Sequence, residues 1–485
     1  MAVMINDLIS RAVVPSRLAL ICRGGRTVGY NPDRNIWHRL DDDVAEVLRW
    51  LRAGRESKGL GAHLVRRFSI EDGNRRLEEI LQWAILHRLL FLDFEPRPPS
   101  PHAHQAALAS VYWICTQACN LRCTYCYQEA TVARKQELST AEGLDLVDQT
   151  AEVGASTLVF TGGEPFSRRD LLEIARYSKS TGLQTNVITN GHYITQRRID
   201  DVAKTFDRVT VSLDSGVAKH HDRMRGQGSW EKAARAIDLL LKAGVDVDVN
   251  SVLTRSGMHD VGELLAFIRD RKIGAHRIVA QSPMGRGGDH RTDELRPGEL
   301  LELDDRLYEL GQELGGKSNM KESFAEAART TKGSVRDHCG AGLSEVSVDP
   351  EGWVYPCKLL QYDQDRTGNV REKRLSEILT SHPVLQRIRQ PFTGSLQPCS
   401  TCIIKNHCGG GCRGIHASFT GSWEIAEPLL CAQLRRTFEL RAFASTGSVP
   451  PRQAARFIRL DGSPAPLSDS APSRTFIPLE QVRRP

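Results

Sequence analysis

The 485-residue sequence lacks long apolar runs and blocks of like charge. Without an apolar run of membrane-spanning length, no transmembrane helix is expected. The N-terminus also lacks a cationic start followed by an apolar stretch and a small-residue cleavage site, so we expect a cytoplasmic protein. The net charge of +6 is spread along the chain, so it permits an acidic peptide partner but does not argue for a nucleic-acid partner.

The twelve cysteines, in contrast, are strongly clustered. One is Cys22, four lie between Cys115 and Cys126, and seven lie between Cys339 and Cys431. In a reducing cytosol, such clusters indicate metal ligands or redox groups and not a disulfide framework. The apolar fraction of 40% and the charged fraction of 26% are those of an ordinary globular protein.

Three of these cysteines stand on one short loop. Cys119, Cys123 and Cys126 have the spacing C-x3-C-x2-C, and such a loop can turn three thiolates onto one iron-sulfur cluster. A cuboidal cluster has four irons, so one iron would stay open to an organic ligand. The alternative is a zinc knuckle, but zinc needs a fourth Cys or His nearby. Only Cys115 is close, and it lies on an expected strand, so the sequence favours a cluster.

Between Val111 and Gly287 the sequence alternates strand-like and helix-like segments. The six expected buried strands are Val111–Cys115, Thr157–Phe160, Gln184–Ile188, Arg208–Val211, Val247–Val252 and Arg277–Ala280. The amphipathic segments between them include Thr140–Ala151, Arg168–Thr181 and Trp230–Ala243. Repeated βα units imply parallel strands with functional residues at their C-terminal ends. We therefore expect an α/β fold, with a partial (β/α)6 TIM barrel over residues 109–290.

Polar or glycine-rich turns follow the first four expected strands. They are the cysteine loop, Thr161-Gly162-Gly163-Glu164-Pro165, Thr189-Asn190-Gly191 and Ser212-Leu213-Asp214. Gly162 and Gly163 would let backbone groups approach a ligand closely, and Glu164 adds negative potential suited to an ammonium group. These turns suit a zwitterionic amino acid joined to a nucleoside, although Thr-Asn-Gly is also a common turn.

The cysteine loop, with Tyr127 after its last cysteine, resembles the signature of the radical S-adenosylmethionine (SAM) enzymes. The resemblance implies that the open iron chelates SAM and that an electron then cleaves its sulfonium. A 5'-deoxyadenosyl radical would then remove a hydrogen atom from the substrate. Gly162 to Pro165 resembles the SAM-binding GGEP motif of this family. The residues that the resemblance assigns to SAM are Tyr127, Gly162, Gly163, Glu164, Asn190, Ser212 and Arg225.

Two later runs resemble patterns of the peptide-modifying branch of this family. In the first, Ser212 is followed by His221-Asp222 and then by Arg225, and the matching Ser and Arg of that branch contact SAM. A guanidinium fits a methionine carboxylate well. The second run is Pro283-Met284-Gly285-Arg286-Gly287, which is equally well explained as a glycine-rich exit loop.

Seven cysteines follow a helical connector expected over residues 291–335. Cys339 and Cys357 flank an Asp349-Pro350-Glu351-Gly352 hairpin turn, a short helix is expected at Leu375–Ile388, and the other five cysteines follow it. The spacing resembles the auxiliary-cluster domain named SPASM, expected here over residues 336–440, although the C-x2-C pair alone would fit a zinc ribbon. The resemblance implies two auxiliary [4Fe-4S] clusters. The implied ligands are Cys399, Cys402, Cys408 and Cys431 for the outer cluster, and Cys339, Cys357 and Cys412 for the inner one.

The sequence departs from this pattern at two positions. Residues 333–338 contain no thiol to complete the inner set. Either Asp337 or His338 ligates, or an open iron binds a substrate thiolate, which is a route to a thioether. Lys358 follows Cys357 where sulfatase-maturing relatives carry a proton-accepting Asp. An ammonium group cannot accept a proton unless its pKa is strongly depressed, which argues against formylglycine formation.

Residues 1–95 are expected to form a separate module. The β-prone runs Leu18–Cys22, Thr27–Tyr30 and Ile36–Leu40 precede three helices, which we expect to start after Asp41, near Leu60 and at Ser69. The order resembles winged-helix-like modules that bind a leader peptide as an added strand. A generic packing or dimerisation domain is the alternative. Residues 96–108 are an expected linker, and residues 441–485 an expected, mostly disordered tail.

Together these features are typical of a radical SAM/SPASM enzyme that installs a thioether or carbon-carbon crosslink in a ribosomally made peptide or protein. Two alternatives stay open. One is a protein-maturing or small-molecule dehydrogenase with the same clusters, and the other is a non-catalytic zinc or cluster scaffold that binds a peptide. The expected partners are a precursor peptide and an electron donor, namely a reductase, flavodoxin or ferredoxin. No nucleic-acid or membrane partner is expected.

Overall fold

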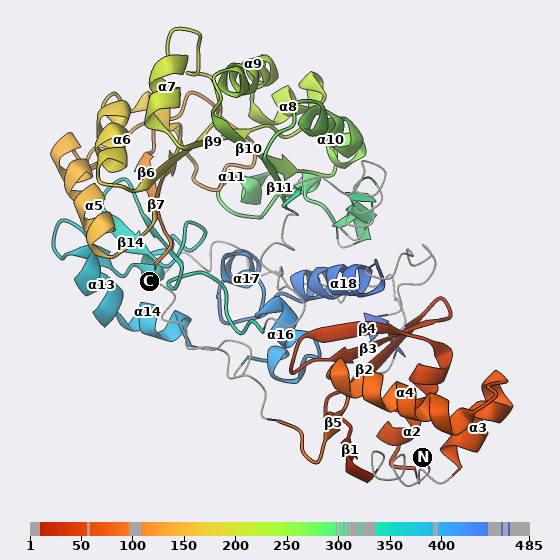
Figure 1. Ribbon diagram of the computed structural model, residues 1–485. Helices are drawn as coiled ribbons and strands as arrows, with labels where there is room; N and C mark the ends of the chain where they lie inside the picture. The colour runs from red at the N-terminus through yellow and green to blue at the C-terminus, as the bar shows by residue number, and fades with distance from the viewer. Residues whose placement is uncertain are drawn as a thin grey trace.

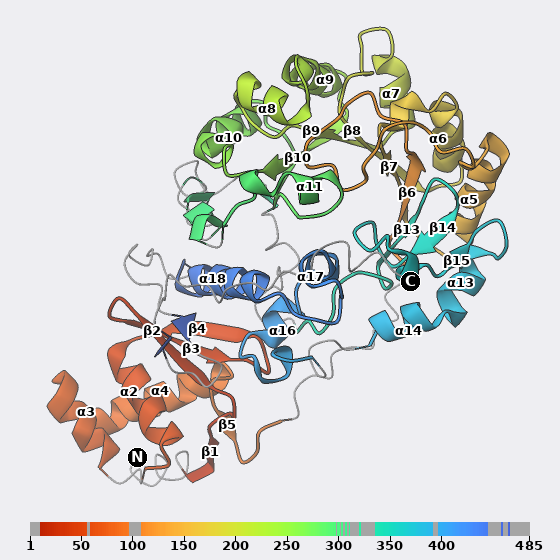
Figure 2. The ribbon, with the colours of Figure 1, turned by 180° about the vertical axis from the view of Figure 1, so that it is seen from behind.

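The computed structural model has three parts, with the C-terminal helices lying between the barrel and the N-terminal module (Figures 1 and 2). The structure describes residues 10–55, 59–96, 108–296, 298–300, 302–303, 306–307, 310, 320–321, 335–390, 396–444, 457–458 and 464–465. Within this described part, no helix is long and apolar enough to cross a membrane.

A ten-stranded sheet forms the largest part, in the order β12-β11-β10-β9-β8-β7-β6-β13-β14-β15. All neighbours from β6 to β12 run parallel. The barrel strands are β6 (Ser110–Thr116), β7 (Thr157–Gly162), β8 (Gln184–Thr189), β9 (Arg208–Ser212), β10 (Asp246–Leu253) and β11 (Ala275–Ala280). The helices between and after them are α5 (Thr140–Glu152), α6 (Leu171–Ser180), α7 (Ile199–Thr205), α8 (Ala218–Arg225), α9 (Ser229–Lys242), α10 (Val261–Asp270) and α11 (Arg286–Asp289). The predicted partial (β/α)6 barrel is confirmed.

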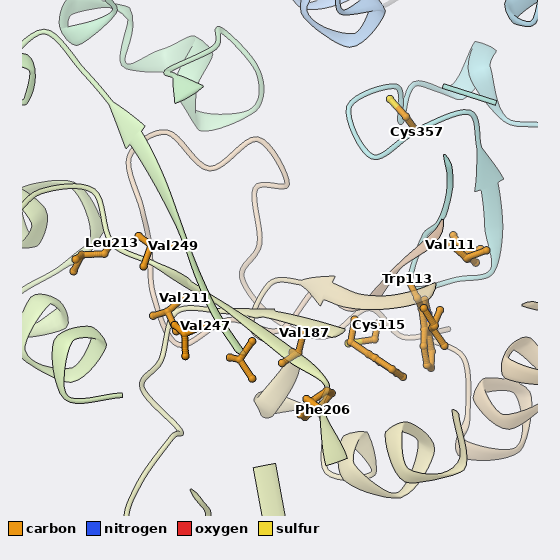
Figure 3. Close-up of a cluster of buried hydrophobic side chains, with 14 of the residues drawn as sticks. Val111, Trp113, Cys115, Val187, Phe206, Val211, Leu213, Val247, Val249 and Cys357 are labelled. Carbon is orange, nitrogen blue, oxygen red and sulfur yellow. The ribbon is translucent and has the colours of Figure 1, made fainter. Parts of the chain in front are cut away.

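Alternate residues of β6 face opposite sides of this sheet. Val111, Trp113 and Cys115 are fully buried in the core between the sheet and its helices (Figure 3). Tyr112 faces the barrel interior, where it lines a cavity of about 120 Å³. Cys115 therefore belongs to the core, as its predicted place on a strand implied.

The C-terminal cysteine domain continues the barrel sheet. Its strands are β13 (Glu345–Val348), β14 (Trp353–Tyr355) and β15 (Gly368–Asn369). β13 pairs parallel with β6, which places Val346 beside Val111. The predicted hairpin turn joins β13 to β14, and Gly352 takes a left-handed φ of 89° there, a conformation that favours glycine. This hairpin brings Cys357 to the edge of the barrel.

The helices of this domain depart from the prediction at one point. They are α13 (Leu375–Ser381), α14 (Pro383–Ile388), α16 (Lys405–Cys408), α17 (Arg413–Thr420) and α18 (Pro428–Ala444). The single helix expected at Leu375–Ile388 is wrong, because His382 has extended backbone before Pro383 and starts a new helix there. A proline disfavours helical backbone in the residue before it.

The connector and the tail are described only in part. Within the connector, the described residues 298–310 are helical, but Met320–Lys321 form β12, which pairs with the outer edge of β11. The helical prediction is wrong at β12. The unpaired backbone groups along the outer edge of β11 can bind a neighbouring strand, and Met320–Lys321 pair with them. In the tail, β16 (Phe457–Ile458) pairs with β17 (Pro464–Ala465). Most of the expected linker and tail, and part of the connector, lie outside the described residues.

The N-terminal module has the predicted order of a hairpin, a strand and three helices. Its elements are β2 (Ala19–Arg23), β3 (Arg26–Asn31), β4 (Ile36–Leu40), α2 (Asp42–Arg52), α3 (Leu60–Phe68) and α4 (Gly73–Leu86), with β1 (Ala12–Val13) paired to β5 (Phe91–Leu92). The expected helix start at Ser69 is wrong, because Ser69 ends α3 in a left-handed conformation. Asp72 caps α4 instead, accepting hydrogen bonds from the backbone N–H groups of Asn74 and Arg75.

One face of the module's sheet packs on the SPASM domain. Tyr30 and Trp37 are buried against Phe438 of α18, with ring centres 4.6 Å and 5.7 Å away. The same core contains Cys402 and Cys408 of the predicted outer set. The module and the outer cysteines therefore share one apolar core, although the sequence suggested separate domains.

The shared core predicts that Phe438→Ala lowers the free energy of unfolding by about 3–5 kcal/mol, because it leaves a cavity between the two domains. Thermal unfolding of the metal-free protein measures this loss. Phe94→Ala is the matched control, since Phe94 is 68% exposed and its removal leaves no cavity. Equal losses for the two variants would contradict the shared core.

Candidate functional site

The cysteine loop lies between β6 and α5, at the C-terminal end of the barrel sheet. Cys119, Cys123 and Cys126 are close enough for their thiols to interact electrostatically. Burial raises the pKa of Cys123 to about 11, although Arg225 opposes this rise. The structure thus brings the three predicted cluster ligands together.

The Gly162-Gly163 turn touches the backbone that leads into this loop. A Cβ atom at Gly162 would lie 2.5 Å from the carbonyl oxygen of Thr116, and one at Gly163 would lie 2.3 Å from that of Ala118. The backbone N–H of Gly163 donates to Thr116 O at 2.9 Å. The sequence assigned these glycines to a close approach by a ligand. In the structure, a close approach of the protein's own backbone requires them.

Glu164 is fully buried and fixes two strand ends. One carboxylate oxygen accepts hydrogen bonds from the Thr189 hydroxyl at 2.8 Å and the Phe166 backbone N–H at 3.1 Å. The other accepts from the backbone N–H of Asn190 at 2.8 Å. Burial raises the pKa of Glu164 to about 7, although these three bonds oppose the rise. Glu164 therefore couples the turn after β7 to the turn after β8.

Asn190 carries this network on to the cysteine loop. Its side-chain amide donates to Asn120 Oδ1 at 2.9 Å, and its Oδ1 accepts from the backbone N–H of His192 at 3.0 Å. The side chains of Asn120 and His192 also contact each other at 2.8 Å. Burial, with Lys232 and Arg225 nearby, lowers the pKa of His192 to about 4. Its buried Nε2 has no hydrogen-bond partner among the residues the structure describes.

Arg225 and Asp214 make a buried ion pair beside the loop. Arg225 donates two hydrogen bonds to the Asp214 carboxylate, at 2.6 Å and 3.0 Å. Tyr125, from within the cysteine loop, donates its hydroxyl proton to the same carboxylate. Burial acts to raise the pKa of Asp214, but Arg225 outweighs it and lowers that pKa below its usual value. The pair holds the loop after β9 against the cysteine loop.

The sequence assigned Arg225 to SAM but gave no role to Tyr125 or Asp214. A role for Asp214 could have been inferred from its place, since it is an acidic residue just after a predicted parallel strand. Ser212, the other predicted SAM contact in this region, ends β9 beside Asn250 of β10. It lies at the same strand end as Asp214.

Arg286 is a second residue whose role the sequence left open. Its backbone N–H donates to Cys126 O at 3.1 Å, and its guanidinium donates to Cys123 O at 2.9 Å and Ala130 O at 3.2 Å. A Cβ atom at Gly285 would lie 2.6 Å from Cys126 O. The glycine-rich run after β11 is distant from the cysteine loop in sequence. It nevertheless holds that loop through hydrogen bonds to the loop's backbone carbonyl groups.

Tyr127 lies on the side of the loop that faces the SPASM domain. Burial raises the pKa of its phenol, and its charged neighbours include Lys358 and the thiol of Cys357. Lys358 places its Nζ 3.8 Å from the centre of the Tyr112 ring and 3.7 Å from Glu345 Oε2. Burial acts to lower the pKa of Lys358, but Glu345 and Tyr112 raise it above its usual value. Lys358 is thus held protonated beside the barrel cavity.

The seven SPASM cysteines form the two predicted sets. The thiols of Cys339, Cys357 and Cys412 interact electrostatically with one another. Those of Cys399, Cys402, Cys408 and Cys431 do the same. Burial raises the pKa of Cys412 to about 11 and that of Cys399 to about 12. Near the inner set, the buried carboxylate of Asp337 contacts Nδ1 of His338.

These residues fit the cofactors that the resemblance implies. All twelve cysteines are free thiols. The raised pKa values of Cys123, Cys399 and Cys412 mean that metal binding at these thiols must release protons, as it does at other thiolate sites. Within the described residues, no three His, Cys, Asp or Glu side chains converge as one metal ion would require. A cuboidal cluster instead meets each thiolate through a separate iron.

Comparison with known proteins matches both halves of the chain. Residues 113–268 match the radical SAM superfamily, and residues 339–403 match SPASM, an iron-sulfur cluster-binding domain. A mycofactocin maturase of Mycobacterium ulcerans is 31% identical over 308 residues, which are 62% of this chain and 81% of that protein. An AdoMet-dependent heme synthase of Methanosarcina barkeri is 28% identical over 341 residues, which are 66% of this chain and 95% of that protein.

Among solved structures, SuiB of Streptococcus suis is similar in fold. Its structure with S-adenosylmethionine has a TM-score of 0.55 and 16% sequence identity, and its structure with precursor peptide SuiA has a TM-score of 0.56 and 15% identity. Each comparison covers 86% of this chain and 99% of the other. This likeness extends beyond the barrel and SPASM domain, and it concerns the fold alone.

The buried carboxyl of Glu164 predicts a pH-dependent stability. Its pKa of about 7 lies above the ordinary value of 4.5, so the folded protein binds this proton more tightly than the unfolded chain. The contribution of this group to stability is complete below about pH 4.5 and is lost as the pH rises through about 7. We expect Glu164→Gln to show a smaller decrease in melting temperature than wild type between pH 5.5 and pH 8.

The metal-free protein serves for this measurement, so cluster loss does not interfere. Glu173→Gln, at an exposed position of α6, is the control and should keep the wild-type decrease. A Glu164→Gln variant with an unchanged pH dependence would show that this carboxyl is not responsible.

The turns after β7, β8, β9 and β11 contact one three-cysteine loop, and two further thiol sets lie in the C-terminal domain whose strands continue the barrel sheet. Both domain matches fall on these two regions. The identity of 31% covers 81% of a curated relative. The chain therefore belongs to the radical SAM superfamily, among the enzymes that carry a SPASM iron-sulfur cluster-binding domain.

Proposed function

We propose that this enzyme modifies a ribosomally made peptide or protein at a site between the cysteine loop and the inner thiol set. The observation that carries the proposal is the place of Tyr127 and Lys358, which connect the loop to Cys357 beside the barrel cavity. The relative named mycofactocin maturase and the likeness to SuiB bound to its precursor peptide support a peptide substrate.

In this proposal, Cys119, Cys123 and Cys126 hold a [4Fe-4S] cluster that binds SAM. When bound, this cluster and SAM supply a 5'-deoxyadenosyl radical that removes a hydrogen atom from the substrate. The protein's own part is to fix the site. The assigned SAM contacts are Tyr127, Gly162, Gly163, Glu164, Asn190, Ser212 and Arg225. Glu164 acts mainly through Asn190, since both its oxygens accept internal hydrogen bonds.

Arg225 has two roles in the proposal: it pairs with Asp214 and it contacts SAM. Its two hydrogen bonds to Asp214 fix the plane of the guanidinium. Arginine has five N–H donors, so a third can still meet a carboxylate of SAM. Tyr125 shares Asp214, so the position of Arg225 depends on the cysteine loop being folded.

The two SPASM thiol sets are proposed to hold auxiliary [4Fe-4S] clusters. The outer set has four thiols and the inner set three, so the inner cluster has one coordination position for Asp337, His338 or a substrate thiolate. Lys358 is held protonated and is not a proton acceptor. This supports a thioether or carbon-carbon crosslink as the product, rather than formylglycine.

The N-terminal module is proposed to bind the leader of the substrate. The sheet order leaves β2 and β4 as its outer strands, and a peptide can add to such an edge. Because the module packs on the outer cysteine set, a bound leader would be anchored to the SPASM domain. A cytoplasmic location and a reductase, flavodoxin or ferredoxin donor complete the proposal.

A second candidate function rests on the heme synthase relative. That protein is matched over 95% of its own length, so a small-molecule substrate is the alternative. The share of this chain that is matched does not separate the two candidates, since it is 66% for the heme synthase and 62% for the mycofactocin maturase, but the need for the N-terminal module does. Only the peptide candidate gives the module a substrate to bind.

The cofactor assignment predicts about twelve irons and a similar amount of sulfide per chain after anaerobic reconstitution, since three cuboidal clusters hold four irons each. Replacing Cys119, Cys123 and Cys126 together with Ala should lower the iron content to about eight and abolish dithionite-dependent SAM cleavage. Iron analysis and chromatography of 5'-deoxyadenosine measure the two effects.

Cys115→Ala is the matched control, since Cys115 lies in the core and not on the loop. It should keep the iron content and SAM cleavage. Stoichiometric zinc without SAM cleavage in the wild type would instead support a non-catalytic scaffold.

The peptide candidate predicts a substrate among short reading frames beside the gene. The encoded peptide should stimulate 5'-deoxyadenosine formation and lose two hydrogen atoms for each crosslink, as mass spectrometry detects. Removing the leader from this peptide should abolish the reaction. Equal turnover of the leaderless peptide would refute leader binding, and turnover of a tetrapyrrole instead would favour the second candidate.

A further inference from the structure

The two SPASM thiol sets are joined by one arginine side chain. Arg336 stands three residues before Cys339 of the inner set. Its backbone N–H donates to the carbonyl oxygen of Asn406 at 2.9 Å, two residues before Cys408 of the outer set. Arg336 therefore lies where the two cysteine-bearing segments meet.

The missing side chain of Gly409 leaves the space that the Arg336 side chain occupies. A Cβ atom at Gly409 would lie 2.4 Å from Cγ and 2.6 Å from Cδ of Arg336. Gly409 also has a left-handed φ of 64°, which disfavours other residues. The segment after Cys408 is thus built so that the arginine side chain can pack directly against it.

The guanidinium acts on both thiol sets. It is within electrostatic range of the thiols of Cys339 and Cys408. Burial lowers the pKa of Arg336, and the two thiols oppose this effect. An arginine nevertheless stays protonated in proteins, so a positive charge is fixed between the two sets. Arg435, in contrast, lies beside the outer set, with a 3.7 Å contact from its Nη2 to Cys402 Sγ.

We propose that Arg336 is a positioning residue that sets the reduction potentials of both auxiliary clusters together. The inference rests on the proposed function, in which the two thiol sets hold iron-sulfur clusters. Reduction adds negative charge to a cluster, and a fixed cation nearby stabilises the reduced form. Arg336 therefore raises both potentials, and a change at this single position moves them in the same direction.

The test is an EPR-monitored redox titration of the two auxiliary clusters. Replacing Cys119, Cys123 and Cys126 with Ala in the full chain removes the third cluster signal. In this background, Arg336→Gln should lower both potentials, with about a tenfold change in the reduced-to-oxidised ratio at a fixed potential, which is 59 mV for one electron. Arg336→Lys keeps the charge and should recover at least half of the shift.

Two further variants separate this role from a merely structural one. Arg435→Gln should lower only the outer potential, and Arg374→Gln, in an exposed ion pair with Asp145 and Glu152, should lower neither. Gly409→Ala crowds Arg336 without removing its charge, and should move both potentials while the iron content stays constant.

The proposal is overturned if Arg336→Gln moves one potential or none, or if Arg336→Lys behaves like Arg336→Gln. Loss of iron from the Arg336 variants, with normal iron in the background protein, would also overturn it, because the arginine would then act in assembly. Absence of iron and sulfide from the background protein itself would instead refute the proposed function.

Discussion

The structure depends on one constraint: the cysteine loop has no regular secondary structure and is held by side chains from neighbouring strand ends. Asn190 reaches it from the end of β8, Asp214 and Arg225 from β9 and α8, and Arg286 from α11, while Glu164 holds the turn that carries Asn190. Several of these groups are buried, so leaving one without its partner costs about 1–3 kcal/mol. The loop geometry is therefore fixed in large part by the protein's own hydrogen bonds.

A second constraint connects the three parts of the chain. β13 adds to the barrel sheet beside β6, which places Cys357 near Tyr127. The N-terminal sheet packs on α18 around Tyr30 and the outer cysteines. The SPASM domain is thus linked to the barrel by strand pairing and to the N-terminal module by a shared apolar core.

Much of this could be predicted from the sequence. Strand periodicity located all six barrel strands, and the resemblance to the SPASM domain assigned the inner and outer cysteine sets. The spacing could not show that Glu164 serves Asn190 or that Tyr125 shares Asp214 with Arg225, because such contacts join different strand ends. Local patterns also missed the helix break at Pro383 and placed a helix start at Ser69, where Asp72 supplies the cap instead. Long-range pairing, as between β13 and β6, has no local signal at all.

The most direct test of this account is anomalous X-ray diffraction at the iron edge, from crystals of the reconstituted protein grown anaerobically with SAM. The account predicts three iron peaks, one beside Cys119, Cys123 and Cys126 and one beside each SPASM thiol set. It also predicts SAM density against the turns after β7, β8 and β9. Absence of an iron peak at the cysteine loop, or SAM bound away from these turns, would contradict it.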